Sequence, residues 1–328
     1  GAVSLYVKDT TSHSIYKKRI QIISLDDFDN KSELFRNKNY IINFCEKYKN
    51  TKIKIIEIHN RPEYLNFLIK KKVKSKFIFF FHNNPQDIRG SKTVNERLNI
   101  LENTDKVFFV SNWTKKKFFE DLPFKTKSNC EILYPSIDKQ NIFYKNKKKQ
   151  IIFTGKLNSS KGYDLFGEAI IKILNKYPDW KAIVAGNEPR EKYDFKHKNL
   201  KIYPWLPHKK ILDLYKHSSI SIVPSRWEEP FGRTAMESSA HGCATITSNR
   251  GGLTETFKNN LVLKELTVNS IYKKIEHLIK NPKKLRKIQF NNFKNPLHLL
   301  NETTKYIDSV KLNLLEKTIN ILKSQGPR

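Results

Sequence analysis

Two glutamates, Glu229 and Glu237, stand eight positions apart in the stretch EEPFGRTAME (Glu228–Glu237). A proline and a glycine between them mark a turn, and the residues from Arg233 to Gly242 predict a helix. Glu229 is therefore expected in a loop, and Glu237 about one and a half turns inside the helix at about 1.5 Å rise per residue. Such carboxylates can form an acid/base pair, clamp two parts of one extended ligand, or simply be charges at a helix start.

Two lysines lie in an upstream stretch, FTGKLNSSKG (Phe153–Gly162). Gly155 and Gly162 permit tight turns. Lys156 and Lys161 place two cations before a predicted helix, whose first N–H groups already favour an anion. A diphosphate fits that arrangement. The alternative explanation is two solvated lysines in a lysine-rich chain.

Two further stretches follow predicted strands in the same half of the chain. In TSNRGGLTET (Thr247–Thr256), Gly251 and Gly252 are predicted to open another helix with bare backbone donors. In YPWLPHKK (Tyr203–Lys210), Trp205 offers a flat apolar surface. Because ligands of doubly wound sheets bind beyond the carboxyl ends of the strands, these stretches are expected to form one site.

The elements that must position these residues are short apolar runs alternating with longer helical patterns, which predicts parallel sheets covered on both faces. The predicted strands of a first unit begin at Ile20, Ile53, Phe77, Lys106 and Glu131, and its helices cover 32–48, 62–72, 92–102 and 113–121. The predicted strands of a second unit begin at Ile151, Lys181, Leu200, Ser219 and Ala244. The sequence thus predicts two α/β domains.

The predicted domain limits follow from a charged run, Lys145–Lys149, which is the expected linker. An N-terminal domain then covers 1–147 and a C-terminal domain covers 148–295. Residues 296–328 contain one long helical pattern, about 297–323, which is expected to return across both domains.

The chain of 328 residues has a formal net charge of +30, from 62 Lys+Arg and 32 Asp+Glu. Lysines are scattered through nearly every segment, so we interpret most of this charge as compositional bias that still attracts anionic partners. The three cysteines have no CxxC spacing, which argues against a zinc site or a disulfide framework and favours a reducing compartment. No apolar run is long enough to span a bilayer, and the start shows no signal-peptide pattern.

The stretch from Pro224 to Thr256 resembles the nucleotide-sugar signature of retaining GT4 glycosyltransferases, in which a second Glu follows the first after seven residues in a P-F-G context. FTGKLNSSKG resembles the upstream basic segment of the same family. The resemblance covers most of the chain and is strongest from Ile151 to Thr256. It implies the GT-B fold, with two Rossmann-like, doubly wound parallel-sheet domains facing a central cleft. It also implies transfer of a sugar from a nucleotide-diphosphate sugar to a hydroxyl with retention, without a metal ion or other cofactor.

Carried over by position, the resemblance implies a role for each residue of the predicted donor site. Glu229 would hold hydroxyls of the donor sugar and take part in catalysis, and Glu237 would accept from the ribose hydroxyls. Backbone amides at Phe231 and Gly232, together with Lys156, Lys161 and Trp205, would complete the nucleotide-sugar site. Lys161 is also predicted to be catalytic because it neutralises the leaving diphosphate. Lys156 stands where the family usually has Arg. Lysine keeps the positive charge but lacks the guanidinium that can donate two parallel hydrogen bonds to a phosphate.

The N-terminal half carries the predicted acceptor side. The start, GAVSLYVKDT, resembles the family's glycine-rich loop and first helix, so Gly1 would border the donor and the first strand of the domain would lie upstream. His82, directly after FIFFF, resembles the position that faces the reacting sugar and acceptor, where it would be catalytic. Asn60 and Arg61, in IEIHNRPEYL, resemble residues on the acceptor side.

The expected partners are a UDP-, GDP- or ADP-linked sugar and a saccharide or lipid-linked acceptor, in cell-surface polysaccharide, lipopolysaccharide or glycolipid synthesis. The basic runs Ile69–Lys76 and Trp113–Phe119, the second of which mixes cations with aromatics, predict contact with an anionic membrane surface. The predicted location is therefore cytoplasmic and peripheral on the inner face of the cell membrane.

Three alternatives stay open at the level of sequence. Glu229 and Glu237 could be a glycosidase pair, which needs carboxyls about 5 to 10 Å apart. The basic chain could be a non-catalytic nucleic-acid-binding protein, although it has no nucleic-acid module. Asp27–Asp29 (DFD) fits the DxD metal motif of the other large glycosyltransferase fold, but we interpret it as a surface loop.

Overall fold

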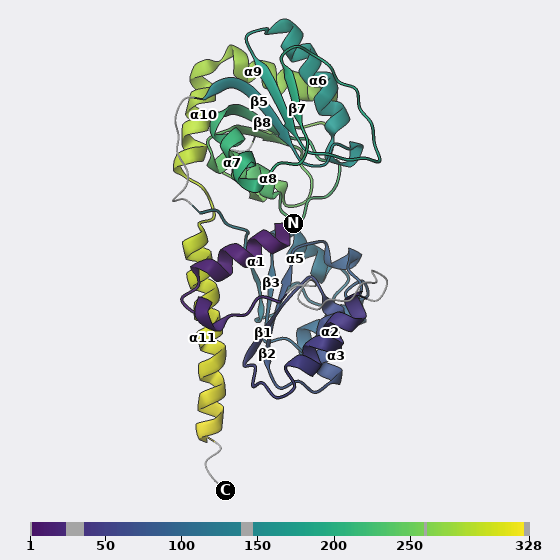
Figure 1. Cartoon of the computed structure of the whole chain (residues 1–328), viewed down its shortest axis with the longest axis vertical. Helices are drawn as coiled ribbons and strands as arrows, with labels where there is room; N and C mark the ends of the chain where they lie inside the picture. Colours follow the sequence, from purple (N-terminus) through teal and green to yellow (C-terminus); the bar gives the residue numbers. More distant parts are fainter. Residues whose placement is uncertain (1, 24–35, 139–146, 259–260, 325–328) are drawn as a thin grey trace. The chain divides into compact units, whose positions relative to one another are not determined.

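Two separate parallel sheets organise the chain in the computed structural model, which describes residues 2–23, 36–138, 147–258 and 261–324 (Figure 1). Unit 1 comprises Gly1–Tyr134 together with Leu300–Arg328, and unit 2 comprises Pro135–Leu299. The expected domain limit at 147 differs from this division. Residues 135–138 go with unit 2 because Ile137 forms a parallel bridge with Leu299, and its N–H donates to the carbonyl of His298 at 3.0 Å.

Unit 1 has a four-stranded parallel sheet in the order β1-β2-β3-β4. The strands are β1 (Ile55–His59), β2 (Lys76–Phe81), β3 (Lys106–Phe109) and β4 (Cys130–Ile132). The helices α2 (Arg36–Lys47), α3 (Pro62–Lys70), α4 (Val94–Glu102) and α5 (Asn112–Phe119) pack through an aromatic-rich core against one face. The side chains of β2 and β3 are almost all buried, as expected for a sheet covered on both sides.

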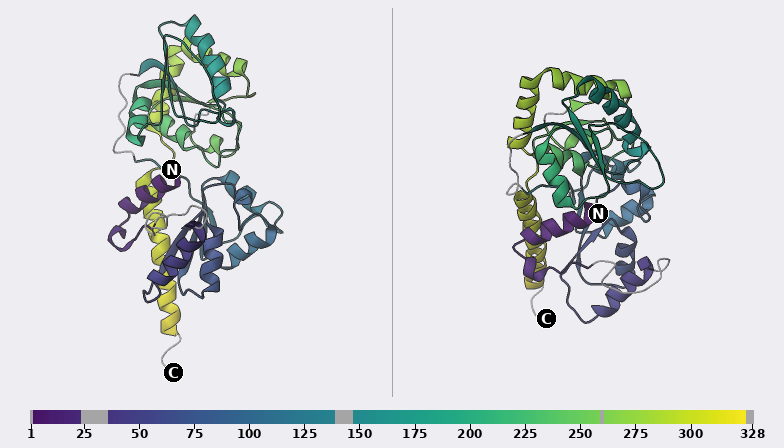
Figure 2. Two further views of the ribbon diagram at one scale, coloured as in Figure 1. Left: turned by 45° about the vertical axis from the view of Figure 1, so that its right-hand side comes forward. Right: turned by 45° about the horizontal axis from the view of Figure 1, so that its top comes forward.

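The other face of this sheet is covered by the two ends of the chain. Helices α1 (Ala2–His13) and α11 (Leu300–Ser324) lie side by side in both views of Figure 2. Tyr6 from α1 and Ile307 from α11 pack with Phe80 in one buried cluster. The buried carboxylate of Asp308 accepts from the Ser14 hydroxyl at 2.6 Å and from the Ile15 N–H at 2.9 Å. The predicted C-terminal helix is therefore confirmed as an element, and it belongs to unit 1.

One predicted strand of unit 1 is wrong in the described residues. Residues 20–23 are irregular, and the last two residues of the predicted run, 24 and 25, lie outside the described part of the chain. A strand needs a neighbour for its backbone N–H and C=O groups. The described strands of this sheet pair with one another, and none pairs with residues 20–23.

Two of the three aromatic side chains in the second basic run are unavailable for the predicted membrane contact. Phe118 and Phe119, in the run Trp113–Phe119, are 0% and 5% exposed because they belong to the core between α5 and the sheet. On the same helix Lys116 is exposed and Trp113 is half-buried. In the described residues, no helix combines the length and the apolar character that crossing a membrane would require.

Unit 2 has a six-stranded parallel sheet in the order β10-β9-β8-β5-β6-β7. The strands are β5 (Lys148–Thr154), β6 (Lys181–Ala185), β7 (Leu200–Tyr203), β8 (Ser218–Val223), β9 (Ala244–Thr247) and the two-residue β10 (Leu261–Val262). The helices are α6 (Tyr163–Lys176), α7 (His208–His217), α8 (Arg233–Ala240), α9 (Val268–Lys280) and α10 (Pro282–Lys294). From β5 the chain first adds β6 and β7 on one side and then β8, β9 and β10 on the other. The strand order therefore reverses between β5 and β8.

The expected linker is part of unit 2 wherever it is described. Lys148 and Lys149 begin β5, and residues 145–146 lie outside the described part of the chain. The ammonium of Lys147 donates to the carbonyls of Tyr215 at 2.8 Å and His241 at 2.6 Å. Burial lowers the pKa of Lys147. The charged run predicts a linker because the sequence does not show that Lys147 turns inward.

Candidate functional site

Two loops meet at the strand-order reversal of unit 2. One follows β5 and runs from Gly155 to Gly162, and the other follows β8 and runs from Pro224 to Gly232. The carboxyl ends of neighbouring parallel strands lie at the same edge of a sheet, and a reversal of strand order opens a crevice there. The fold thus brings together the two stretches that the sequence singled out.

The first loop owes its shape to two residues. The side chain of Asn158 accepts from the Lys161 N–H at 3.0 Å and begins a single 3-10 turn, Ser159–Lys161. Gly162 then takes φ +71°, and a Cβ at this position would lie 2.0 Å from the carbonyl oxygen of Pro224. Only glycine combines this backbone conformation with so close an approach of the second loop.

Hydrogen bonds join the two loops directly. The backbone N–H groups of Arg226 and Trp227 donate to the Ser160 carbonyl at 2.9 and 3.1 Å. The guanidinium of Arg226 also grips the Asp164 carboxylate with two bonds of 2.7 Å. The position of Lys161 relative to the second loop is therefore set by backbone contacts.

Lys161 and Glu229 form the central ion pair of this crevice. The Lys161 ammonium lies 2.5 Å from Glu229 Oε1, and their side chains are 25% and 13% exposed. The same ammonium lies 4.4 Å from the centre of the Trp227 ring, within range of a cation–π interaction. The cation and the carboxylate predicted to touch the donor are thus in direct contact. Trp227 was not predicted; its position two residues before Glu229 was the available signal.

Glu228 has a different task from its neighbour Glu229. Its carboxylate accepts from the Gly251 N–H and pairs with Arg250 at 3.1 Å. The Glu229 carbonyl accepts from the Gly252 N–H at 2.7 Å, and a Cβ on Gly251 would lie 2.1 Å from that carbonyl oxygen. The two glycines thus hold the backbone of the Glu229 loop. The predicted helix after them is wrong: only one 3-10 turn, Leu253–Glu255, follows.

Glu237 is buried and contacts the side chains of Arg233 and His208. It is 4% exposed on α8, with Oε1 2.5 Å from Arg233 Nε and 2.9 Å from His208 Nε2. Burial raises the pKa of this carboxyl, but the His208 hydrogen bond and the Arg233 charge outweigh burial, so the pKa lies below its ordinary value. The alternative that these glutamates are simply charges at a helix start is therefore wrong for Glu237. Arg233, four residues earlier on the same helix face, could have been found from its spacing.

The other predicted donor residues differ in exposure. Lys156 is exposed, and its charge helps to lower the pKa of the nearby Glu188 after the larger effect of the Arg190 hydrogen bond. Trp205 is 59% exposed and Phe231 only 4%. Gly232 begins α8 at φ +108°, where a Cβ would lie 2.4 Å from Leu253 Cδ2. Gly1 lies outside the described residues, as does the motif Asp27–Asp29.

In unit 1, the predicted acceptor residues surround the ends of β1 and β2. The His82 N–H donates to Asn60 Oδ1 at 2.7 Å, and the Asn60 N–H donates to the Phe80 carbonyl at 2.9 Å. Asn60 is 5% exposed with φ +56°, so its side chain fixes the turn that carries His82. Arg61 is exposed, and its guanidinium donates to the Asn60 carbonyl at 3.2 Å.

The His82 ring contacts a second histidine that the sequence reasoning missed. Its Nε2 lies 2.9 Å from Nδ1 of His59, the last residue of β1. Burial, and then the charge of His59, hold the pKa of His82 well below 6.5. His59 immediately precedes Asn60, and its position two residues after Glu57 on a strand with an otherwise apolar pattern was the available signal.

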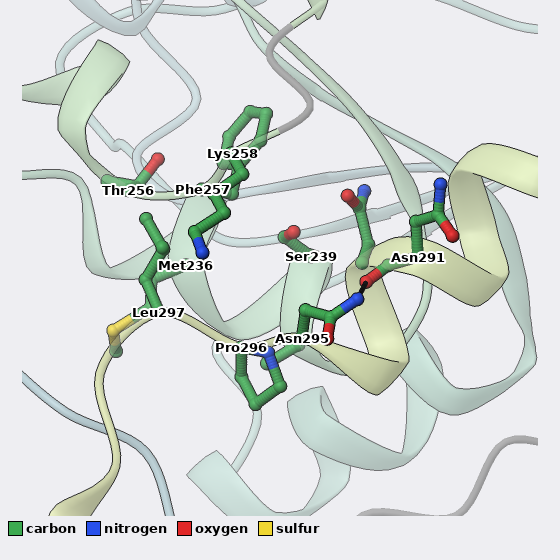
Figure 3. A pocket seen from close by; sticks show the side chains of 11 residues that line it. Met236, Ser239, Thr256, Phe257, Lys258, Asn291, Asn295, Pro296 and Leu297 are labelled. Atoms are coloured by element: carbon green, nitrogen blue, oxygen red, sulfur yellow. Dashed lines mark hydrogen bonds between the residues drawn. The ribbon is translucent and has the colours of Figure 1, made fainter.

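Unit 2 also contains a pocket of about 390 Å³ between the C-terminal half of α8, the end of α10 and the segment 256–258 (Figure 3). Its polar lining includes Ser239 and Asn291, and the Asn295 amide donates to the Asn291 carbonyl at 3.4 Å. None of the lining residues is a predicted site residue. Across the described parts of the chain, no group of three or more His, Cys, Asp or Glu side chains has an arrangement that could hold a metal ion.

Comparison with known proteins identifies the family of the unit that contains this crevice. The family described as glycosyl transferases group 1 matches residues 136–295, which is nearly all of unit 2. Unit 2 belongs to the glycosyl transferases group 1 family. The resemblance seen in the sequence is thereby confirmed at the level of this family.

Relatives extend the likeness over both units. The chain is 23% identical over 301 residues to the putative glycosyltransferase YtcC of Bacillus subtilis (strain 168), covering 80% of this chain and 74% of the relative. Among solved structures, Anabaena Alr3699/HepE in complex with UDP has a TM-score of 0.71 at 14% identity, with 86% of this chain and 84% of that chain covered. A glycosyltransferase from Rickettsia africae has a TM-score of 0.69 at 20% identity, with 91% and 86% covered. The predicted GT-B class is confirmed.

Proposed function

We propose that the protein is a retaining glycosyltransferase that moves a sugar from a nucleoside-diphosphate sugar to a hydroxyl acceptor. The observation that carries the proposal is the Lys161–Glu229 pair in the crevice of a group 1 glycosyl transferase unit. In this proposal the diphosphate replaces Glu229 as the ion-pair partner of the Lys161 ammonium. The Glu229 carboxylate can then accept hydrogen bonds from hydroxyls of the donor sugar. HepE, which shares the fold, was solved with UDP, so UDP is the first nucleotide to test.

The proposed chemistry places most of the catalytic effect on fixed cations. The bond between the anomeric carbon and the diphosphate oxygen breaks, and negative charge accumulates on the leaving phosphate. Preorganised donors aimed at such charge are commonly the largest catalytic contribution. Lys161 is preorganised because Asn158, Ser160 and Gly162 fix its loop. Lys156, exposed and one residue after Gly155, is the second cation of the proposal.

Retention fits the way the two carboxylates are held. Glu229 is paired with Lys161, and Glu237 is buried between Arg233 and His208. In this proposal the acceptor attacks on the face that the phosphate leaves, so neither carboxylate has to act as a nucleophile. The acceptor hydroxyl is assigned to the side of His82 in unit 1. A glycosidase pair is disfavoured because its general acid needs a raised pKa, and the pKa of Glu237 is lowered.

Ligand binding can be tested separately from transfer. Thermal unfolding is measured with UDP-, GDP- and ADP-linked sugars, because a ligand that binds the folded state raises the midpoint. We expect one nucleotide class to stabilise the protein and a chelator to leave both binding and transfer unchanged. No stabilisation by any nucleotide sugar would contradict the donor site.

Lys161→Ala tests the central cation. We expect kcat/KM to fall about 100- to 1000-fold, the usual cost of removing one preorganised donor. Lys283→Ala, at an exposed position of α10, is the control for a lost positive charge and should keep wild-type activity. The double variant Lys161→Met with Glu229→Gln leaves no unpaired charge, so it should fold normally and stay inactive. Near-normal turnover in the double variant would overturn the assignment.

A further inference from the structure

A polar track made of Glu57, His59 and His82 lies on the face of the unit 1 sheet that α1 and α11 cover. Alternate residues of a strand share a face, so Glu57 and His59 of β1 lie on the side of Ile55, which packs in the cluster of α1 and α11. Lys311 of α11 reaches this face and lies 2.7 Å from Glu57 Oε1. Burying charged and polar groups under two helices costs free energy unless each has a partner. The track therefore calls for an explanation beyond packing.

The track leads from a fixed charge to the predicted catalytic histidine. Glu57 Oε2 lies 3.9 Å from His59 Nε2, and His59 Nδ1 lies 2.9 Å from His82 Nε2. The His59 ring stacks on Phe80 with centroids 4.4 Å apart, and the Tyr6 ring meets His82 edge-on at 4.9 Å. Each ring is thus held in one orientation by aromatic contacts from α1 and β2.

The donor and acceptor roles along this track follow from the chemistry of its groups. A carboxylate only accepts hydrogen bonds, so the proton of a neutral His59 belongs on Nε2, which faces Glu57. The Nδ1 of His59 is then bare and must accept, so His82 must donate from Nε2. A neutral imidazole carries one proton, which leaves Nδ1 of His82 bare.

The charges of the surrounding groups fit this assignment. Burial raises the pKa of Glu57, but the nearby His59 and the Lys311 charge have the larger opposite effect and lower it to about 2, so Glu57 stays ionised. His82 stays neutral because its pKa is well below 6.5. From α1, the Tyr6 hydroxyl adds no charge because burial raises its pKa. Lys311 is the cation that faces the track from α11.

We propose that Glu57 and His59 are positioning residues that hold His82 as the neutral tautomer protonated on Nε2, so that His82 Nδ1 accepts a hydrogen bond from a substrate hydroxyl. This role rests on the proposed function, because the hydroxyl belongs to the transferred sugar or to its acceptor. Protonation of His59 on Nδ1 would reverse the hydrogen bond and turn His82 Nδ1 into a donor. The track thus couples the state of His59 to what His82 can bind, with no change in the charge of His82.

The tautomers can be measured without any substrate. Long-range ¹H–¹⁵N correlation spectra of the full chain labelled at its 9 histidines distinguish protonated from bare ring nitrogens, and His82→Asn and His59→Asn variants assign the signals. We expect both rings to carry the proton on Nε2 at neutral pH, and Glu57→Gln to weaken that preference at His59. A proton on Nδ1 of His82 in the wild-type protein would overturn the proposal, whether or not the protein transfers sugars.

Kinetics with two substitutions at one position separate positioning from packing. The oxygen of an Asn side chain can take the place of His59 Nδ1 and accept from His82, whereas Leu fills space without accepting. We expect His59→Leu to lower kcat about 10- to 100-fold with the donor KM unchanged, as for other partners that orient a functional histidine. His59→Asn should recover most of this loss. Equal or better activity in His59→Leu than in His59→Asn would show a packing role and overturn the proposal.

Failure of the proposal differs from failure of the proposed function. If wild-type protein transfers no sugar from any nucleotide sugar, the proposed function fails while the tautomer spectra still decide the histidine assignment. If it transfers sugar but His59→Leu and His59→Asn have the same activity, the positioning role alone fails. Circular dichroism and the unfolding temperature of each variant show that the fold is kept.

Discussion

Units 1 and 2 hold their candidate residues by different means. In unit 2 an ion pair holds each carboxylate, Lys161 with Glu229 and Arg233 with Glu237, and His208 also contacts Glu237. In unit 1 the candidate residues are two hydrogen-bonded imidazoles, His59 and His82. Beside them lies one ion pair, Glu57 with Lys311. Charges that are already paired bind a charged ligand by exchanging partners, whereas a fixed tautomer offers one donor or acceptor to a neutral hydroxyl. This difference fits the proposed function, in which unit 2 binds the charged donor and unit 1 contacts a neutral hydroxyl.

The largest expected effect tests whether the charges of unit 2 depend on one another. Glu237→Gln leaves the Arg233 guanidinium, which is only 16% exposed, beside a neutral amide, so we expect unit 2 to lose about 3 to 5 kcal/mol of unfolding free energy. Urea unfolding followed by tryptophan fluorescence measures the loss. Glu228→Gln is the matched control, because its side chain is 43% exposed. It should cost about 1 kcal/mol or less, and equal losses would remove the distinction between the two carboxylates.

The next effect concerns how unit 2 holds its two loops together. Gly162→Ala forces a Cβ to within 2.0 Å of the Pro224 carbonyl oxygen at φ +71°, so we expect a loss of about 3 kcal/mol and a fall in transfer as Lys161 moves. Gly155→Ala is the matched substitution. Gly155 also has a positive φ, of +137°, but its Cβ would meet no atom within 4 Å. It should cost only the backbone strain, about 1 kcal/mol. Equal losses would show that loop contact contributes nothing.

The smallest effect tests the Glu57–Lys311 ion pair of unit 1 through the pH dependence of stability. The pKa of Glu57 is about 2 in the folded protein against an ordinary 4.5. Its contribution is therefore present above pH 4.5 and is lost as pH falls from 4.5 towards 2. The shift and partial exposure of 24% correspond to about 2 kcal/mol. Glu57→Gln should flatten the stability of unit 1 across that pH range, and an unchanged slope would show that other carboxyls dominate.

Local patterns predicted most elements because buried parallel strands are continuous apolar runs. FIFFF and KVFFV became β2 and β3 within one residue at each end. The failures have physical causes as well. Residues 20–23 look like a strand but pair with no described strand, and β10 is too short to leave a pattern. The helix expected after Gly251–Gly252 gave way to one turn, because those glycines bind the Glu228 side chain and the Glu229 carbonyl.

The candidate site divides in the same way. The spacing of Glu229 and Glu237 and the glycines around Lys161 were visible in the sequence, because turns and helix starts need particular residues at fixed positions. The partners were not visible. Lys161 and Glu229 are 68 positions apart, and His208 meets Glu237 across 29 positions. Such pairs depend on which strands become neighbours, and no local pattern encodes that choice.

The sequence by itself determined the family of unit 2, the alternation of strands and helices, and the identity of most charged residues at the crevice. Only the tertiary structure decided that Glu229 pairs with Lys161, that Glu237 is buried, and that the His59 ring contacts the His82 ring. The physical reason is that side-chain protonation and pairing are set by distance and burial. Both arise when β1 and β2, or β5 and β8, are brought edge to edge by the long-range contacts of the folded chain.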